Sequence, residues 1–127
     1  MTGKHKFFRC EHCGNMIGLI ADKGVPLVCC GEEMAELVPN TVEAATEKHL
    51  PEVTKTECGI KVQVGSVVHP MEEAHYITFI YVQTENGGQR KILKPGMEPK
   101  HEFCFVDYKP IAVYEHCNLH GLWMTEL

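Results

Sequence analysis

Four cysteines lie in two tight groups near the start of the chain. Cys10 and Cys13 enclose a two-residue spacer, whereas Cys29 and Cys30 are adjacent and are followed by a glycine. Four thiolates on two tight turns can close around one tetrahedral ion, and zinc and iron both accept four sulfur ligands. The sequence therefore predicts a metal site here. A structural zinc, a vicinal disulfide between Cys29 and Cys30, and free thiols are the alternatives.

Histidines form a second group of candidate ligands, in three short segments at residues 47–51, 69–75 and 116–121. These segments read EKHLP, HPMEEAH and HCNLHG. Neighbouring residues of an extended strand point to opposite faces, so we expect His116 to point away from Cys117 and from the site. The donors that remain are four imidazoles and one thiol: His49, His69, His75, His120 and Cys117.

The chemistry of this second group points to a redox metal. Neutral imidazoles suit iron, copper, nickel and zinc, but five protein ligands exceed the four that zinc usually takes. On octahedral iron they leave one position for an exogenous ligand. A thiolate opposite that position donates electron density to whatever binds there, as it does in thiolate-ligated haem. We therefore expect a small oxygen species as the exogenous ligand.

The remaining cysteines and histidines have simpler interpretations. Cys58 and Cys104 fall in strand-like segments, and free cysteines are among the most buried residues, so we expect both as thiols of the core. His5, His12 and His101 lack other donors close in sequence and are expected at the surface.

Composition limits the class of protein. The chain has 127 residues, of which 44% are hydrophobic and 23% charged, which excludes a disordered chain and a coiled coil. The net charge of −5 argues against nucleic acid and anionic membranes as partners. No apolar run approaches the ~20 residues of a membrane span, and no signal peptide is recognisable. We therefore expect a cytoplasmic protein whose thiols are free or bind metal.

Composition shifts near residue 40, and we place a boundary within residues 37–41. The first segment holds four of the seven cysteines and is near the ~40-residue length below which domains rarely fold unaided. A metal would supply the stability that its small core lacks. Short strands are expected in it at 6–9, 16–20 and 26–28.

The second segment is predicted to consist mostly of strands. A short helix is expected at 42–48, with Thr41 as its N-cap. Asn86, Gly87 and Gly88 predict a hairpin turn. Many short strands at close spacing favour a β-sandwich. The expected strands are 52–57, 60–64, 76–84, 89–93, 102–106, 111–116 and 122–126.

In four motifs the chain resembles the desulfoferrodoxin family, the two-iron superoxide reductases. The motifs are CEHC…CC, EKHLP, HPMEEAHY and CNLHG. The resemblance implies an all-β protein with two domains. Residues 1–37 resemble a small desulforedoxin-like, rubredoxin-type metal domain, 38–40 a linker, and 41–127 a neelaredoxin-like domain with an immunoglobulin-like β-sandwich.

The resemblance also implies two iron ions per chain, without haem or inorganic sulfide. Iron centre I would be a rubredoxin-like site for one-electron transfer, held by Cys10, Cys13, Cys29 and Cys30. Centre II would be a ferrous site with an axial thiolate, four equatorial imidazoles and an open sixth position, held by Cys117, His49, His69, His75 and His120.

The implied activity is one-electron reduction of superoxide to hydrogen peroxide, in superoxide detoxification. Lys48 would attract the anion, and Glu47 would occupy the sixth position of the oxidised iron. Since adjacent helix residues do not share a face, both can reach the iron only if their segment is a mobile loop. Rubredoxin or a similar carrier would be the electron donor, and the protein would be a homodimer. An electron carrier with a structural second metal and a non-catalytic zinc-binding module are the alternative functions.

Overall fold

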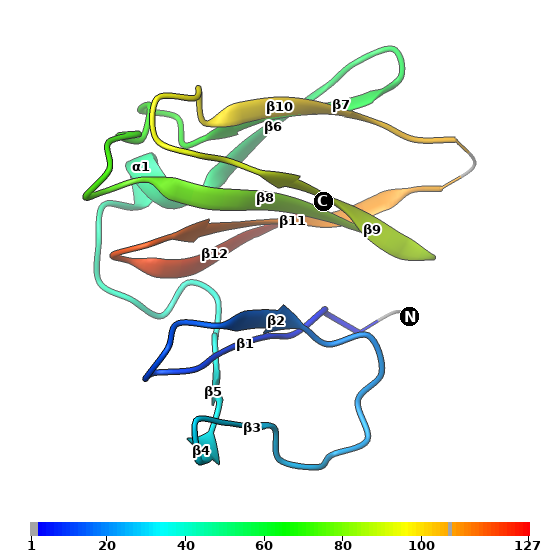
Figure 1. Ribbon diagram of the computed structural model, residues 1–127. Coiled ribbons are helices and arrows are strands. Elements are labelled where there is room, and N and C mark those ends of the chain that lie inside the picture. Colours follow the sequence, from blue (N-terminus) through cyan, green and yellow to red (C-terminus); the bar gives the residue numbers. More distant parts are fainter. Residues whose placement is uncertain (1–2, 107) are drawn as a thin grey trace. The chain divides into compact units, whose positions relative to one another are not determined.

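The computed structural model describes residues 3–106 and 108–127. The chain divides into two compact units, Met1–Val38 and Pro39–Leu127 (Figure 1). None of the helices within the described ranges is long and apolar enough to cross a membrane.

The first unit is built from very short strands. β1 lies between β2 and β5 in one antiparallel sheet, and β3 pairs with β4 in a separate hairpin. Its buried apolar side chains, among the described residues, are those of Phe7 and Cys10. Such a core is too small to stabilise a fold alone. The strands are β1 (Phe7–Arg9), β2 (Met16–Gly18), β3 (Val28–Cys29), β4 (Glu32–Glu33) and β5 (Ala35–Glu36).

The second unit is a β-sandwich, as expected from the sequence. Its smaller sheet has the strand order β10-β7-β6 and its larger sheet the order β12-β11-β8-β9, with antiparallel neighbours throughout (Figure 1). The strands are β6 (Pro51–Lys55), β7 (Gly59–Val64), β8 (Ile77–Thr84), β9 (Gly87–Ile92), β10 (Lys100–Cys104), β11 (Pro110–Cys117) and β12 (Gly121–Glu126).

Alternating side chains of the two sheets form the core of this unit. On β7, Ile60, Val62 and Val64 are buried. They belong to one cluster with Ile80 of β8 and Val113 of β11. Each such side chain contributes about 1.5–3 kcal/mol when fully buried. The core therefore gives rigid strand ends on which a site can be built.

The helix is shorter than the sequence indicated. The prediction of a helix at 42–48 capped by Thr41 is wrong in its bounds, because α1 spans Thr46–His49. Its N-cap is Ala45, which makes no side-chain capping bond. Pro51 has no backbone N–H to continue the helix, and β6 begins there.

Cys58 and Cys104 are joined in a disulfide, so the prediction of two buried core thiols is wrong. Cys104 is the last residue of β10 and pairs in register with Gly59, the first residue of β7. Cys58 precedes Gly59, which places the two cysteine Cα atoms 4.7 Å apart, within disulfide range. Both residues are exposed. The strand register, which sequence reasoning did not supply, brings them together.

Candidate metal centres

Four sulfurs converge in the first unit. Cys10 and Cys13 lie in the turn between β1 and β2, and Cys29 and Cys30 lie at the turn between β3 and β4. The Sγ atoms of Cys13 and Cys29 are 3.6 Å apart, and those of Cys29 and Cys30 are 4.0 Å apart. A tetrahedral ion with metal–sulfur bonds of ~2.3 Å requires sulfur separations of about 3.8 Å. The spacing therefore fits one metal ion.

The protonation states of these cysteines also indicate that a cation is needed to form four thiolates. The backbone N–H of Cys13 lowers the pKa of Cys10 to about 6. Hydrogen bonds with Cys10 and Cys13 raise the pKa of Cys29, and bonds with Cys13, Cys10 and Cys29 raise the pKa of Cys30 to about 12. The protein alone thus favours the thiolate at Cys10 and the protonated thiol at Cys29 and Cys30. A bound metal ion would stabilise the others as thiolates.

Asn15 completes this centre and was not singled out from the sequence. Its backbone N–H lies 3.4 Å from Cys13 Sγ, and its side-chain Nδ2 lies 3.9 Å from Cys29 Sγ. Both groups aim N–H dipoles at sulfurs and offset their negative charge. The position of Asn15 two residues after Cys13 was the available signal.

Four imidazoles and one thiol converge in the second unit, and their ligand atoms all lie within 4.8 Å of one another. The rings form a closed cycle in which each meets the next edge-on. Neighbouring ring centroids are 4.6 to 5.0 Å apart, with interplanar angles of 72° to 89°. This is the arrangement of four ligands around a square plane. In cyclic order the residues are His49, His69, His75 and His120, and the fifth donor is Cys117.

Hydrogen bonds select the nitrogen that each ring presents. Nδ1 of His49 donates to the carbonyl of Ala45 at 2.7 Å, and Nδ1 of His69 donates to the carbonyl of Pro70 at 2.7 Å. These bonds assign the tautomers and leave both Nε2 atoms as lone-pair donors. Within the described chain, the buried Nε2 of His69 and Nε2 of His75 have no hydrogen-bond partner.

His120 differs from the other three histidines because it offers Nδ1, rather than Nε2, to the site. Its Nδ1 lies 3.1 Å from Nε2 of His49. Adjacent ligands at ~2.1 Å from a metal in a square plane are about 3 Å apart, so this separation fits a shared ion. The site therefore offers three Nε2 atoms and one Nδ1 atom.

Burial shifts the pKa values of the donor side chains, and it keeps the imidazoles unprotonated and able to bind a metal ion. Burial lowers the pKa of His69 to about 4 and also lowers the pKa values of His49 and His75. These imidazoles are consequently neutral, the form that binds metals. Burial raises the pKa of the Cys117 thiol, against the opposing effect of the backbone N–H groups of Leu119 and His120. A cation would stabilise the Cys117 thiolate, so the donor set fits iron.

Trp123 supports two of the ligands and was missed by sequence reasoning. Its indole stacks on the His49 ring, with centroids 4.9 Å apart and an interplanar angle of 22°. Its Nε1–H donates to the backbone carbonyl of His120 at 3.0 Å. One side chain thus orients ligands from α1 and from the turn between β11 and β12.

Asn118 joins the two loops that carry the other ligands, and it too was missed. Its Oδ1 accepts the backbone N–H of Tyr76 at 2.8 Å, and its Nδ2 donates to the carbonyl of Ala74 at 3.1 Å. These residues flank His75, and Asn118 itself follows Cys117. Its place inside the CNLHG motif was the signal that could have revealed it.

Glu47 and Lys48 are both exposed on α1, immediately before His49. The positive charge of Lys48 lowers the pKa values of His49 and His75, so it acts on the imidazole cycle. Beside the larger effect of burial, the charge of Lys48 therefore contributes to keeping these two imidazoles neutral.

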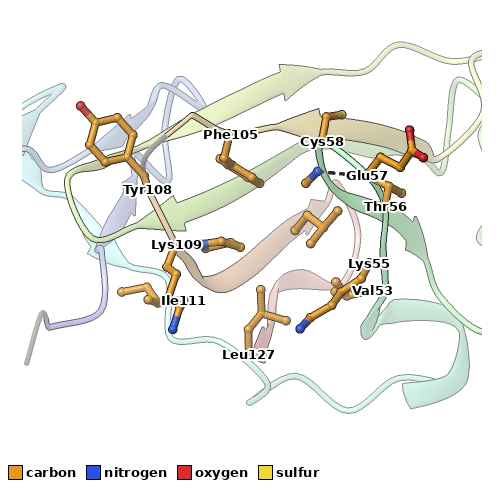
Figure 2. Close-up of a pocket in the computed structure, with 13 residues that line it drawn as sticks. Val53, Lys55, Thr56, Glu57, Cys58, Phe105, Tyr108, Lys109, Ile111 and Leu127 are labelled. Carbon is orange, nitrogen blue, oxygen red and sulfur yellow. Dashed lines mark hydrogen bonds between the residues drawn. The ribbon is translucent and has the colours of Figure 1, made fainter.

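A separate cavity of about 750 Å³ lies at the other end of the sandwich (Figure 2). β11 runs from Pro110 at this cavity to Cys117 at the metal ligands, a span of roughly 23 Å for eight residues in extended conformation. Apolar side chains such as Phe105 and Leu127 line the cavity together with Lys55. None of the nine ligand residues of the two metal centres is among its described lining residues.

Known proteins resemble this chain over almost its whole length. The family model for desulfoferrodoxin matches residues 41–126, and that for the desulfoferrodoxin N-terminal domain matches residues 2–37. Desulfoferrodoxin of Nitratidesulfovibrio vulgaris is 44% identical, with 99% of each chain covered, and that of Syntrophotalea carbinolica is 46% identical, again with 99% of each covered. The superoxide reductase structure from Treponema pallidum has a TM-score of 0.82 at 35% identity, covering 98% of this chain and 100% of that one.

Proposed function

Because this chain belongs to the desulfoferrodoxin family, we propose that it is a superoxide reductase, which converts superoxide, one electron and two protons into hydrogen peroxide. The observation that carries the proposal is the cycle of four edge-on imidazoles with one buried thiol beside it. Five donors leave an octahedral iron one position for substrate. A structural zinc site would need four ligands and no such position.

Iron held in this centre would supply the electron and an open coordination position. The chain's own residues hold and tune it. Three imidazoles would hold it through Nε2 and His120 would hold it through Nδ1, while hydrogen bonds to Ala45 and Pro70 fix two of the rings. Cys117 would hold the ion through its thiolate and donate charge to it. The burial of His49, His69 and Cys117 leaves the partly exposed His75 and His120 nearest to solvent.

Lys48 is proposed to attract superoxide and to orient a proton donor toward it. An exposed ammonium beside the imidazoles is a local positive charge on a chain of net charge −5, and the local field matters more for steering than net charge. Glu47 is proposed to bind the oxidised metal after product leaves. That step requires a change in α1, because Glu47 and Lys48 do not share a helical face.

The four-cysteine centre is proposed to hold the second iron and to act as a one-electron relay. Its two-turn, four-sulfur geometry is that of a rubredoxin-like site. Superoxide reduction consumes one electron per turnover, so an external donor is needed. We propose rubredoxin or a similar small carrier. The proposed domains are residues 1–37 and 41–127, joined by residues 38–40.

A homodimer is proposed from the apolar surface of the first unit. Ile20, Val25 and Val28 are 102%, 71% and 65% exposed, unusual values for aliphatic side chains in so small a unit. A cytoplasmic location is proposed because the five ligand thiols of the two centres persist best in a reducing compartment, where we expect the exposed Cys58–Cys104 pair to be reduced to two thiols. Gel filtration and cell fractionation test these two proposals.

The function is tested by metal content and product yield. Protein from iron-supplemented cells should contain two irons per chain, and its reduced form should release one peroxide for each superoxide consumed. The alternative of a zinc module predicts zinc in both centres and no visible absorption. The alternative of an electron carrier predicts a closed second centre, which forms no adduct with azide or cyanide.

A further inference from the structure

Helix α1 is too short to hold its own conformation. It spans four residues; the Leu50 N–H donates to the Thr46 carbonyl at 2.9 Å and the Lys48 N–H donates to the Ala45 carbonyl at 3.1 Å. Isolated helices shorter than ~12–15 residues are marginal in water. The geometry of Lys48, which follows from this helix, must therefore be fixed by contacts outside it.

The backbone carbonyl of Glu47 makes contacts of this kind with a neighbouring loop. Its helical partner would be the N–H of residue 51, but residue 51 is proline and has none. The Glu47 carbonyl oxygen instead accepts the backbone N–H of Val67 at 2.9 Å and the hydroxyl of Ser66 at 3.2 Å. The loop that follows β7 thus replaces the missing helical bond.

Gly65 allows this loop to approach α1. A Cβ atom at Gly65 would lie 2.5 Å from the Glu47 carbonyl oxygen and 2.8 Å from the Lys48 carbonyl carbon. Both are backbone atoms, so any side chain here would push the helix away. Four residues later the same loop carries His69, whose N–H donates to the carbonyl of Val64 at 3.0 Å. One tight loop therefore fixes a ligand and the backbone of α1 together.

We propose that Ser66 and Gly65 are positioning residues that hold α1, and with it Lys48, in place next to His49 of the imidazole cycle. The inference rests on the superoxide reductase function proposed above. Neither residue touches the metal ligands' nitrogen or sulfur atoms in the contacts described. They act through the Glu47 carbonyl, and therefore through the orientation of the helix that carries Lys48.

The test compares Ser66→Ala with Thr125→Val, since both remove a hydroxyl that donates to a backbone carbonyl. The Thr125 hydroxyl donates to the carbonyl of Pro51 at 2.8 Å, close to α1 but not to Glu47. The superoxide rate constant of the iron-loaded protein is measured against ionic strength. Loss of one hydrogen bond should lower the Ser66→Ala rate about three- to tenfold at low salt. It should also flatten the salt dependence, as removal of the lysine charge would.

Ser66→Thr, which keeps the hydroxyl, should restore both properties, and Thr125→Val should leave both unchanged. Equal effects of Ser66→Ala and Thr125→Val would mean a general loss of stability and would overturn the proposal. A normal rate and a normal salt dependence in Ser66→Ala would also overturn the positioning role. That result would leave the proposed function standing, because the function is tested separately by the peroxide yield of the unmodified protein.

A second readout does not depend on activity. Amide hydrogen exchange in the peptide containing Glu47 and Lys48 should be faster in Ser66→Ala than in the unmodified protein, at equal metal content. Gly65→Ala should have a larger effect in the same direction. Unchanged exchange in both variants would overturn the positioning role, even if superoxide proved not to be the substrate.

Discussion

Glu115 and Cys117 lie two residues apart on β11, and both are fully buried. Alternation along the strand points both side chains to the same side. Within the described residues, neither carboxyl oxygen of Glu115 has a hydrogen-bond partner. Burial raises the pKa of Glu115 well above its usual 4.5. An uncharged carboxyl group therefore lies two residues before Cys117, on the same side of the strand.

This carboxyl group should make stability depend on pH. In the unfolded chain it ionises near pH 4.5, whereas in the folded chain it stays protonated to higher pH. Its contribution to stability is thus fully present below pH 4.5 and is lost as pH rises through the raised pKa. Glu115→Gln removes this loss. The free energy of unfolding of both proteins, measured with denaturant, should show the variant becoming more stable than the unmodified protein as pH rises. Parallel curves of unfolding free energy against pH would contradict this prediction.

The two metal centres should be separable by single substitutions. Cys13→Ser should lower the iron content from the two ions we expect to one and remove the rubredoxin-like absorption, because that centre loses one of its four sulfurs. Cys117→Ser should instead remove the thiolate-to-iron band of the other centre. Metal analysis and optical spectra of both variants check this. Loss of both bands in either variant would show that the centres are not independent.

Asn118→Ala should weaken metal binding without removing a ligand. The side chain ties the loop before His75 to the turn after Cys117, and loss of such supporting bonds typically costs 10- to 100-fold in metal affinity. Competition with a chelator measures the change. Asn86→Ala, in the turn between β8 and β9, is the matched control and should bind metal normally.

The Cys58–Cys104 disulfide should stabilise the second unit without affecting catalysis. It spans a sequence separation of 46 residues, and closing a loop of that length stabilises by up to about 4 kcal/mol in the chain-entropy account. Replacing both cysteines by serine should lower the free energy of unfolding by about 2–4 kcal/mol. Reduction of the unmodified protein should have the same effect. A slower superoxide reaction in the variant would contradict the separation of this end from the site.

Lys48→Ala should slow the reaction with superoxide and weaken its salt dependence. Electrostatic steering raises association rates by 10-fold or more, and screening by salt removes it. Rapid-mixing or radiolysis kinetics at two ionic strengths measure both quantities. Lys109→Ala, at the cavity on the opposite end, changes the net charge equally and should have little effect. Equal effects of the two variants would assign the steering to net charge.

The candidate ligands were predictable because their chemistry is carried by residue type and short spacing. Cys10 and Cys13, or His69 and His75, remain close whatever the rest of the chain does. The β-sandwich was likewise predictable from the closely spaced strand segments. These features depend on local sequence, and the structure brings the donors together as expected.

What could not be predicted depends on register and on contacts between distant segments. Cys58 and Cys104 meet only because β10 pairs with β7 at one specific offset. The first turn of the helix expected at residue 42 does not form, and α1 depends instead on Ser66 and Val67. Nothing in the local sequence distinguishes Trp123 from an ordinary strand residue, because its role comes from contacts with His49 and His120.

The stacking of Trp123 on His49 has an optical consequence. The chain contains a single tryptophan, so its ultraviolet emission comes from one indole in contact with one metal ligand. A transition-metal ion bound to that imidazole would quench the emission, and loss of the ion would restore it. Tryptophan fluorescence should therefore report how much metal the four-histidine centre holds, in unlabelled protein, while the ion is being inserted, removed by a chelator or replaced.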